Sequence, residues 1–179
     1  MDYASELNQR AWKQQWNIAH YLLLGTVIAT VVDLILLLAN ASFFIPYCAA
    51  VPYYLTYFGF FFDGWQVGTY TITGMIMAFV GLAVYLVLWW VTKRHTKWLW
   101  AGLALLIVDT LGLAAIALLF MESPLSCLLE FIFHIVVIYE VAVGIRADKR
   151  LRQAAAEPAP TEEPWDNDTP TDSEYSDWV

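Results

Sequence analysis

Four stretches of the chain are each long and apolar enough to cross a lipid bilayer, and they constrain the fold more than any other feature. A helix that spans the hydrocarbon core needs about twenty mainly apolar residues. The stretches that meet this requirement are residues 18–39, 71–91, 98–120 and 125–145. Since 60% of the residues are hydrophobic and only 15% are charged, a water-soluble domain is not expected. The sequence therefore predicts an all-α membrane protein built on a four-helix bundle.

All nine basic residues would lie on the same side of the membrane if these four stretches cross it. Two precede the first stretch, three lie between the second and third, and four follow the last; they are Arg10, Lys13, Lys93, Arg94, Lys97, Arg146, Lys149, Arg150 and Arg152. Because cytoplasmic loops carry an excess of Lys and Arg, this pattern predicts a multi-pass plasma-membrane protein with both termini in the cytoplasm. Residues 1–17 would form a juxtamembrane segment, residues 18–147 the transmembrane domain and residues 148–179 a tail.

The segment 43–62 complicates the count of four spans, because it holds twenty residues without a charge. A fifth span here would move the basic residues at 93–97 to the opposite side from those at 10 and 13, which the charge pattern argues against. Pro46 and Pro52 also interrupt helical hydrogen bonding. The four tyrosines of the segment favour the wet edge of a membrane. We therefore expect an aromatic re-entrant or interfacial helix between the first and second spans.

Five ionisable side chains lie inside the apolar stretches: Asp33, Asp109, Glu130, His134 and Glu140. A carboxylate at mid-depth costs roughly 2.5 to 3.5 kcal/mol, so such residues seldom lie there without a partner or a task. At about 1.5 Å per residue, Asp33 and Glu130 share the outer third of the bundle, and Asp109 and His134 share the middle. Glu140 lies in the inner third. Because Glu130 and His134 are four residues apart, both can reach one cluster.

Three explanations of this cluster are open. In the first, Asp109 and His134 form a hydrogen-bonded pair that fixes the register of two helices, and either Asp33 or Glu130 is protonated. The second is a stepped relay for protons or small cations that ends at Glu140. The third is a metal site, which has the least support because a Glu-x3-His spacing is weak evidence for a complete ligand set. No metal or cofactor is therefore predicted.

The motifs of known four-span membrane enzymes are missing. The disulfide-oxidising and vitamin K epoxide reductase types need a C-x-x-C pair, and this chain holds only Cys48 and Cys127. Lipoprotein signal peptidase carries asparagine-containing motifs around two aspartates, and these are absent near Asp33 and Asp109. No Ser-His-Asp arrangement, phosphate-binding glycine loop or basic nucleic-acid patch is visible. We therefore expect a non-enzymatic membrane protein, either an accessory subunit or a small sensor. The alternative is a homo-oligomeric proton- or cation-coupled transporter.

The two cysteines fall near the same predicted face of the membrane. Cys48 lies in the connection after the first span, and Cys127 lies at the outer end of the fourth. Disulfides persist in the compartment that this face contacts, so a bridge between the two is one hypothesis. Small buried thiols are the equally ordinary alternative.

The last part of the chain has a different composition. Residues 157–179 hold eight acidic residues, no basic residue and four prolines. A segment this polar is predicted to be disordered. Trp165, Tyr175 and Trp178 could form a docking motif for a cytoplasmic protein partner, although a solvated tail without a partner explains them equally well.

Small residues mark the faces along which the spans should pack. Gly74, Ala78 and Gly81 share one face of the second span, and Gly102 and Gly112 lie along one side of the third. Small side chains let helix backbones approach closely, which is how spans associate in lipid.

The third and fourth spans resemble a family of small four-span membrane proteins from Gram-positive, Firmicutes-type bacteria, itself uncharacterised. The features that carry the resemblance are Asp109-Thr110, His134, Tyr139, Gly-Ile-Arg at 144–146 and Pro-Tyr-Tyr-Leu at 52–55. The resemblance covers most of the membrane part and not the acidic tail. It implies a four-helix membrane fold and a plasma-membrane location, and it implies no activity.

Overall fold

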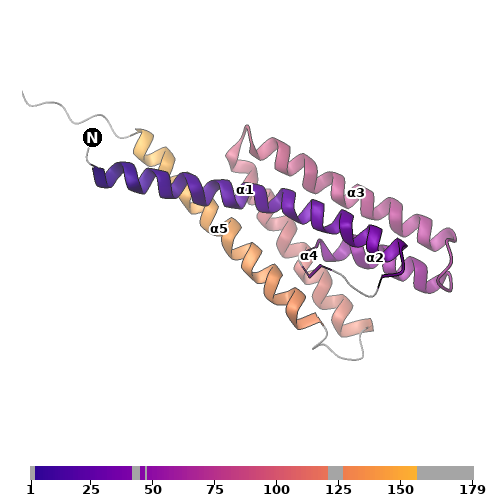
Figure 1. Ribbon diagram of the computed structural model, residues 1–179. Coiled ribbons are helices and arrows are strands. Elements are labelled where there is room, and N and C mark those ends of the chain that lie inside the picture. The colour runs from indigo at the N-terminus through magenta and orange to yellow at the C-terminus, as the bar shows by residue number, and fades with distance from the viewer. Residues whose placement is uncertain (1–2, 42–44, 47, 121–126, 157–179) are drawn as a thin grey trace, which may run out of the picture.

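The computed structural model describes residues 3–41, 45–46, 48–120 and 127–156, and the described residues are helical apart from short connections (Figure 1). Their elements, in chain order, are α1 (Tyr3–Leu38), α2 (Ala50–Phe62), α3 (Thr69–Thr92), the short 3-10 helix η1 (Thr96–Trp98), α4 (Leu99–Phe120) and α5 (Leu128–Ala156). The all-α prediction is therefore confirmed. The predicted tail beyond residue 156 and its docking residues Trp165, Tyr175 and Trp178 lie outside the described residues.

Four of the helices are long and apolar enough to cross a membrane. They cover Glu6–Leu38, Thr69–Thr92, Thr96–Phe120 and Leu128–Ala156. Their outward faces carry large apolar side chains that no other described residue covers, such as Leu118 with 79% of its surface exposed. Water would penalise such a surface, whereas lipid tails solvate it well. The chain is thus a multi-pass membrane protein with the predicted four spans.

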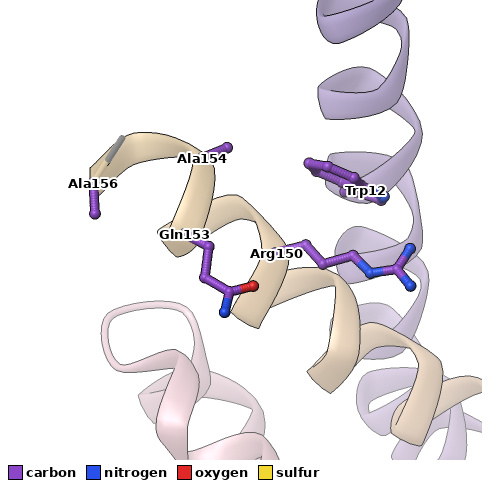
Figure 2. Close-up of a pocket in the computed structure, with 5 residues that line it drawn as sticks. All are labelled: Trp12, Arg150, Gln153, Ala154 and Ala156. Carbon is purple, nitrogen blue, oxygen red and sulfur yellow. The ribbon is translucent and has the colours of Figure 1, made fainter. Parts of the chain in front are cut away.

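Helices α1 and α5 extend beyond the predicted apolar stretches and run alongside each other past the end of the other helices (Figure 1). The two helices approach closely where Gly144 of α5 faces Ala19 of α1. Further toward the ends, the guanidinium of Arg150 lies 5.8 Å from the centre of the Trp12 ring (Figure 2). This cation–π contact and the helix pairing account for helical structure in segments that are too polar to lie in a bilayer.

The helix α2 is re-entrant. Its 13 residues span only about 20 Å, which is shorter than the hydrocarbon core of about 30 Å. The chain leaves α1 through Asn40, which adopts a left-handed φ of 55°, and then returns to the centre of the bundle. There, the backbone N–H groups of Ala50 and Val51 bond to Asp109, halfway along α4. From that point α2 runs outward again and is followed by α3. The structure thus selects the re-entrant form of the predicted aromatic helix.

Helices α2 and α3 form a tight antiparallel hairpin because glycines lie at their contact. A Cβ atom on Gly59 of α2 would lie 2.6 Å from the carbonyl oxygen of Tyr70. Gly74 of α3 meets the backbone carbonyl of Leu55, and Gly81 meets the ring of Pro52. The sequence prediction that small residues of the second span mark a packing face is confirmed, and its partner is the re-entrant helix.

We expect Gly59→Ala to destabilise the protein by about 1–3 kcal/mol, because the added methyl group overlaps a backbone that cannot move alone. Gly81→Ala is the matched control. Its Cβ would lie 3.1 Å from a Pro52 side-chain atom, which can shift by a few tenths of an ångström. Thermal unfolding in detergent should show a clearly larger loss for Gly59→Ala. Equal midpoints for the two variants would contradict the close α2–α3 contact.

Candidate functional site

Asp109 lies in the middle of the buried stripe of α4 and binds the N-terminus of α2. Its Oδ2 atom accepts a hydrogen bond from the backbone N–H of Ala50 at 2.8 Å, and its Oδ1 atom accepts one from Val51 at 2.9 Å. Ala49, at the N-cap position, provides no side-chain cap of its own. The first N–H groups of a helix lack intrahelical partners and carry partial positive charge. Asp109 therefore supplies, from another helix, the cap that the sequence of α2 lacks.

His134 of α5 completes the contacts of Asp109. Its Nε2 atom lies 3.2 Å from Asp109 Oδ2, and its Nδ1 atom lies 2.9 Å from the backbone carbonyl oxygen of Glu130. Both nitrogens therefore lie within hydrogen-bonding distance of an oxygen atom, and a protonated ring can donate to both. The two side chains are 3% and 5% exposed. The predicted pairing of Asp109 with His134 is present as a buried hydrogen-bonded contact, and Asp109 also holds α2.

Two side chains of α1 bind the backbone that leads into α2. Asp33 Oδ1 accepts from the N–H of Ile45 at 2.6 Å, and Thr30 Oγ1 accepts from the N–H of Ala49 at 2.7 Å. Non-helical backbone at membrane depth is stable only where protein groups satisfy its donors. Thr30, Asp33 and Asp109 do this for the re-entrant segment.

Glu130 contacts α2 through a side chain. The hydroxyl of Tyr54 donates a hydrogen bond of 3.1 Å to its Oε2 atom. Glu130 Oε1 and Asp33 Oδ2 are buried and receive no hydrogen bond from the residues described. No hydrogen bond joins Asp33 to Glu130 within that part of the chain, although the sequence places them at matched depth. Both instead bind the re-entrant segment, at different points.

Glu140 lies apart from the other four predicted site residues. The buried stripe of α5 includes Glu130, His134 and Val137, whereas Glu140 is half-buried. It lies six positions after His134, which is about 9 Å along the helix and about a third of a turn around it. Its side chain forms no hydrogen bond with the four other residues, all of which are described. The structure thus brings four of the five predicted residues to the re-entrant segment and leaves Glu140 outside.

In this structure Cys48 and Cys127 are both buried thiols, and the disulfide proposed from the sequence is not present between them. Cys48 lines a small cavity together with His134 and Val137. Cys127 belongs instead to a buried cluster with Ala50 and Tyr54 of α2. The two thiols thus have different neighbours.

The space beside the polar residues is small. The cavity lined by Thr26, Cys48, Leu106, His134 and Val137 has a volume of about 10 Å³, which is the size of one water molecule at most. Among the described residues, no three His, Cys, Asp or Glu side chains gather in the manner of a metal site. The arrangement is thus a buried polar layer, formed by Thr30, Asp33, Asp109, Glu130 and His134. Its side chains hold the re-entrant segment.

Thr30 was not recognised from the sequence, and its contribution can be measured. We expect Thr30→Val to destabilise the protein by about 1–3 kcal/mol, because the N–H of Ala49 would be buried without an acceptor. Thr73→Val is the matched control, since Thr73 is exposed and bonds only its own helix, at Thr69. Thermal unfolding of both variants in detergent checks this, and similar midpoints would contradict the role assigned to Thr30.

Asp63 is a second residue that the sequence analysis missed. It lies in the turn after α2 and caps α3, accepting hydrogen bonds on Oδ2 from the Thr71 backbone N–H at 2.6 Å and from its hydroxyl at 2.8 Å. The Thr71 backbone bond is the largest of several that hold the pKa of Asp63 below its ordinary value. A Cβ on Gly68 would lie 2.5 Å from its carboxyl carbon, which explains the glycine there. An Asp-Gly pair five to six residues before a helix is the signal that could have indicated this cap.

The Asp63 cap makes stability depend on pH. Because its pKa is lower in the folded state, the stabilisation is present above the unfolded pKa of about 3.9 and is lost as pH falls through the folded pKa. We expect Asp63→Asn to lower the thermal unfolding midpoint at pH 7. The difference from the native chain should shrink as pH falls below about 3.9. A difference that does not change between pH 7 and pH 3 would contradict the capping role.

Comparisons of this chain with known proteins find no match among family models, curated proteins or solved structures. The resemblance to Firmicutes-type membrane proteins therefore stays a prediction. Conclusions about function rest on the geometry of the buried polar layer and on the charge pattern.

Proposed function

We propose that this chain is a non-enzymatic accessory subunit or small sensor of the membrane, built around a re-entrant helix that its buried ionisable groups hold in place. The observation that carries the proposal is the set of partners of Asp109. Its two oxygens bind two N–H groups of α2 and the His134 ring. A carboxylate in that role positions a structural element, and three of its roughly four acceptor positions face these partners.

The same geometry argues against a proton relay through Asp109 and His134. A relay group must release a hydrogen bond on one side to pass a proton to the other. Both nitrogens of His134 are engaged, and the adjoining cavity is about 10 Å³. Glu140, the predicted end of the relay, lies outside the layer.

A proton- or cation-coupled transporter is the alternative, and one observation favours it. Asp33 Oδ2 and Glu130 Oε1 are buried oxygens that no described residue bonds. Such atoms are suited to hold a transported proton or small cation. Since four helices enclose little lumen, this alternative would require a homo-oligomer.

Flux in proteoliposomes separates the two functions. The purified full chain is reconstituted, and proton entry under an imposed potential is measured with a pH-sensitive dye in the lumen. The accessory or sensor role predicts a rate equal to that of protein-free vesicles. Flux in the native chain that falls in Glu130→Gln, with its unfolding midpoint unchanged, would overturn that role and support transport.

The proposed orientation places both termini in the cytoplasm and the chain in the plasma membrane. Its support is the gathering of every Lys and Arg at one end of the bundle. In a Cys-free background, single cysteines replace Glu6, Trp65 and His95, which are all exposed. An impermeant maleimide added to intact cells should label only the site at Trp65. Labelling of the cysteine at position 6 or 95 would contradict this orientation.

The acidic tail is proposed as the contact for a cytoplasmic protein partner, through Trp165, Tyr175 and Trp178. Its support is the presence of three large aromatic residues in an otherwise polar segment. A photo-crosslinking residue at Trp178 should give one discrete adduct in cells, which changing Trp165 and Tyr175 to Ser abolishes. An adduct pattern unaffected by these changes would indicate a solvated tail.

A further inference from the structure

A cavity of about 410 Å³ opens between α4 and α5 at the end of the bundle where the basic residues gather. Residues of η1 and the start of α4 form one wall, and residues of α5 form the other. Its lining consists of Thr96, Lys97, Trp100, Ile145, Arg146, Asp148, Lys149 and Arg152. None of these residues belongs to the buried polar layer, and the proposed function uses the basic ones only to assign the orientation.

The cavity carries an excess of positive charge, with four basic side chains and one acidic side chain in its lining. Arg152 is held in place by two partners, since its Nε atom lies 2.9 Å from Asp148 and its terminal nitrogen bonds the hydroxyl of Thr96. The other three cations, Lys97, Arg146 and Lys149, form no ion pair with any residue in the described part of the chain. A site that gathers three uncompensated cations is complementary to a phosphate group.

The rest of the lining is apolar and suits an amphiphile. Trp100 has 63% of its surface exposed, and Ile145 lies on the opposite wall. Tryptophan at a helix end favours the headgroup level of a membrane. Beyond Trp100, the outward face of α4 continues with exposed apolar residues such as Val108 and Leu111. A ligand with a charged head and apolar chains can therefore contact both parts at once.

We propose that this cavity binds the phosphate headgroup of an anionic phospholipid, with the acyl chains against the apolar faces of α4 and α5. Basic cavities between spans at the cytoplasmic side are suited to such headgroups. The neighbouring cavity between α1 and α5 offers a contrast (Figure 2). It is larger, about 590 Å³, but Arg150 is the only basic residue among the described residues that line it, and that guanidinium lies over Trp12. The lipid site rests on insertion of the chain in a bilayer and not on the accessory or sensor role.

The test uses the full chain in a neutral detergent, with three probes added in turn. They are a short-chain phosphatidylglycerol, the matching phosphatidylcholine and inorganic phosphate. Binding is read from the rise of the unfolding midpoint with probe concentration, which yields an apparent Kd. We expect saturable binding of phosphatidylglycerol and at least tenfold weaker binding of both other probes. Inorganic phosphate that binds as tightly as phosphatidylglycerol would identify a free anion as the ligand and overturn the lipid assignment.

Charge variants separate this site from general attraction to a basic surface. Neutralising two of its cations in Arg146→Gln/Lys149→Gln should raise the Kd for phosphatidylglycerol about tenfold or more. Arg10→Gln/Lys13→Gln removes the same charge from α1 at the same end of the bundle, and it should change the Kd less than twofold. Equal effects of the two variants would overturn the proposal.

A second measurement leaves every cation in place. Phosphatidylglycerol with brominated chains quenches nearby tryptophan, so the quenched signal should fall when Trp100 is replaced by Phe. Trp90 lines neither cavity, so replacing it by Phe should not lower the quenched signal. Quenching that does not depend on Trp100 would contradict the placement of the lipid.

Discussion

Asp109→Asn should destabilise the protein by about 3–5 kcal/mol, the loss expected when one partner of a buried ion pair is removed. An asparagine offers one acceptor oxygen to a site where three donors converge, from Ala50, Val51 and His134. Its amide N–H group would also face one of those donors. The N-terminus of α2 would then lie at mid-membrane with an unsatisfied N–H group, and the His134 charge would lack its counter-ion.

The matched control for Asp109→Asn is Glu6→Gln, which also converts an acid to its amide. Glu6 forms a loose surface pair with Arg10 at 3.9 Å, and such pairs contribute between zero and about 1 kcal/mol. Chemical unfolding in detergent should therefore separate the two variants clearly. Similar stability would show that Asp109 does not hold α2.

His134→Ala should cost a similar amount, about 3–5 kcal/mol, because it leaves the Asp109 carboxylate buried without its cation. The double variant Asp109→Asn/His134→Gln, compared with Asp109→Asn and His134→Gln alone, then tests their coupling. Neutral partners can hydrogen-bond each other, so we expect the double variant to be more stable than the sum of the single losses by about 0.5–3 kcal/mol. Recovery should stay partial, since Ala50 and Val51 still need acceptors.

The three possible outcomes of this cycle have distinct meanings. Full recovery in the double variant would indicate that the pair matters and the α2 cap does not. Strictly additive losses would show that Asp109 and His134 do not interact. Only partial recovery agrees with a carboxylate that serves a histidine and a helix N-terminus together.

Much of the architecture follows from the sequence, because the bilayer imposes strong rules of length and charge. The four spans could be predicted from apolar length, and the re-entrant segment from Pro46, Pro52 and the side on which the basic residues lie. The Asp109–His134 pair followed from depth alone, since helical rise converts residue number into depth.

Other features left no comparable signal in the sequence. The N–H groups of Ala50 and Val51 belong to the backbone, and no residue type indicates which side chain will bind them. Thr30 looks like any threonine of a membrane helix until the chain re-enters beside it. Glu140 was grouped with the cluster by depth, and Cys127 was paired with Cys48 by side of the membrane. The rotation of Glu140 around α5 and the neighbours of the two cysteines depend on packing, which sequence spacing does not specify.

The central claim is that Asp109 holds the N-terminus of α2 inside the bundle, and amide hydrogen exchange of Ala50 and Val51 tests it most directly. The chain is labelled with ¹⁵N at alanine and valine, placed in lipid nanodiscs and transferred to D₂O, and the amide signals are followed by NMR. In the native chain, both amides should stay protected as long as that of Val137 in the buried stripe of α5. In Asp109→Asn, they should exchange much faster while Val137 stays protected. Rapid exchange of Ala50 and Val51 in the native chain, or protection that Asp109→Asn leaves unchanged, would contradict the account.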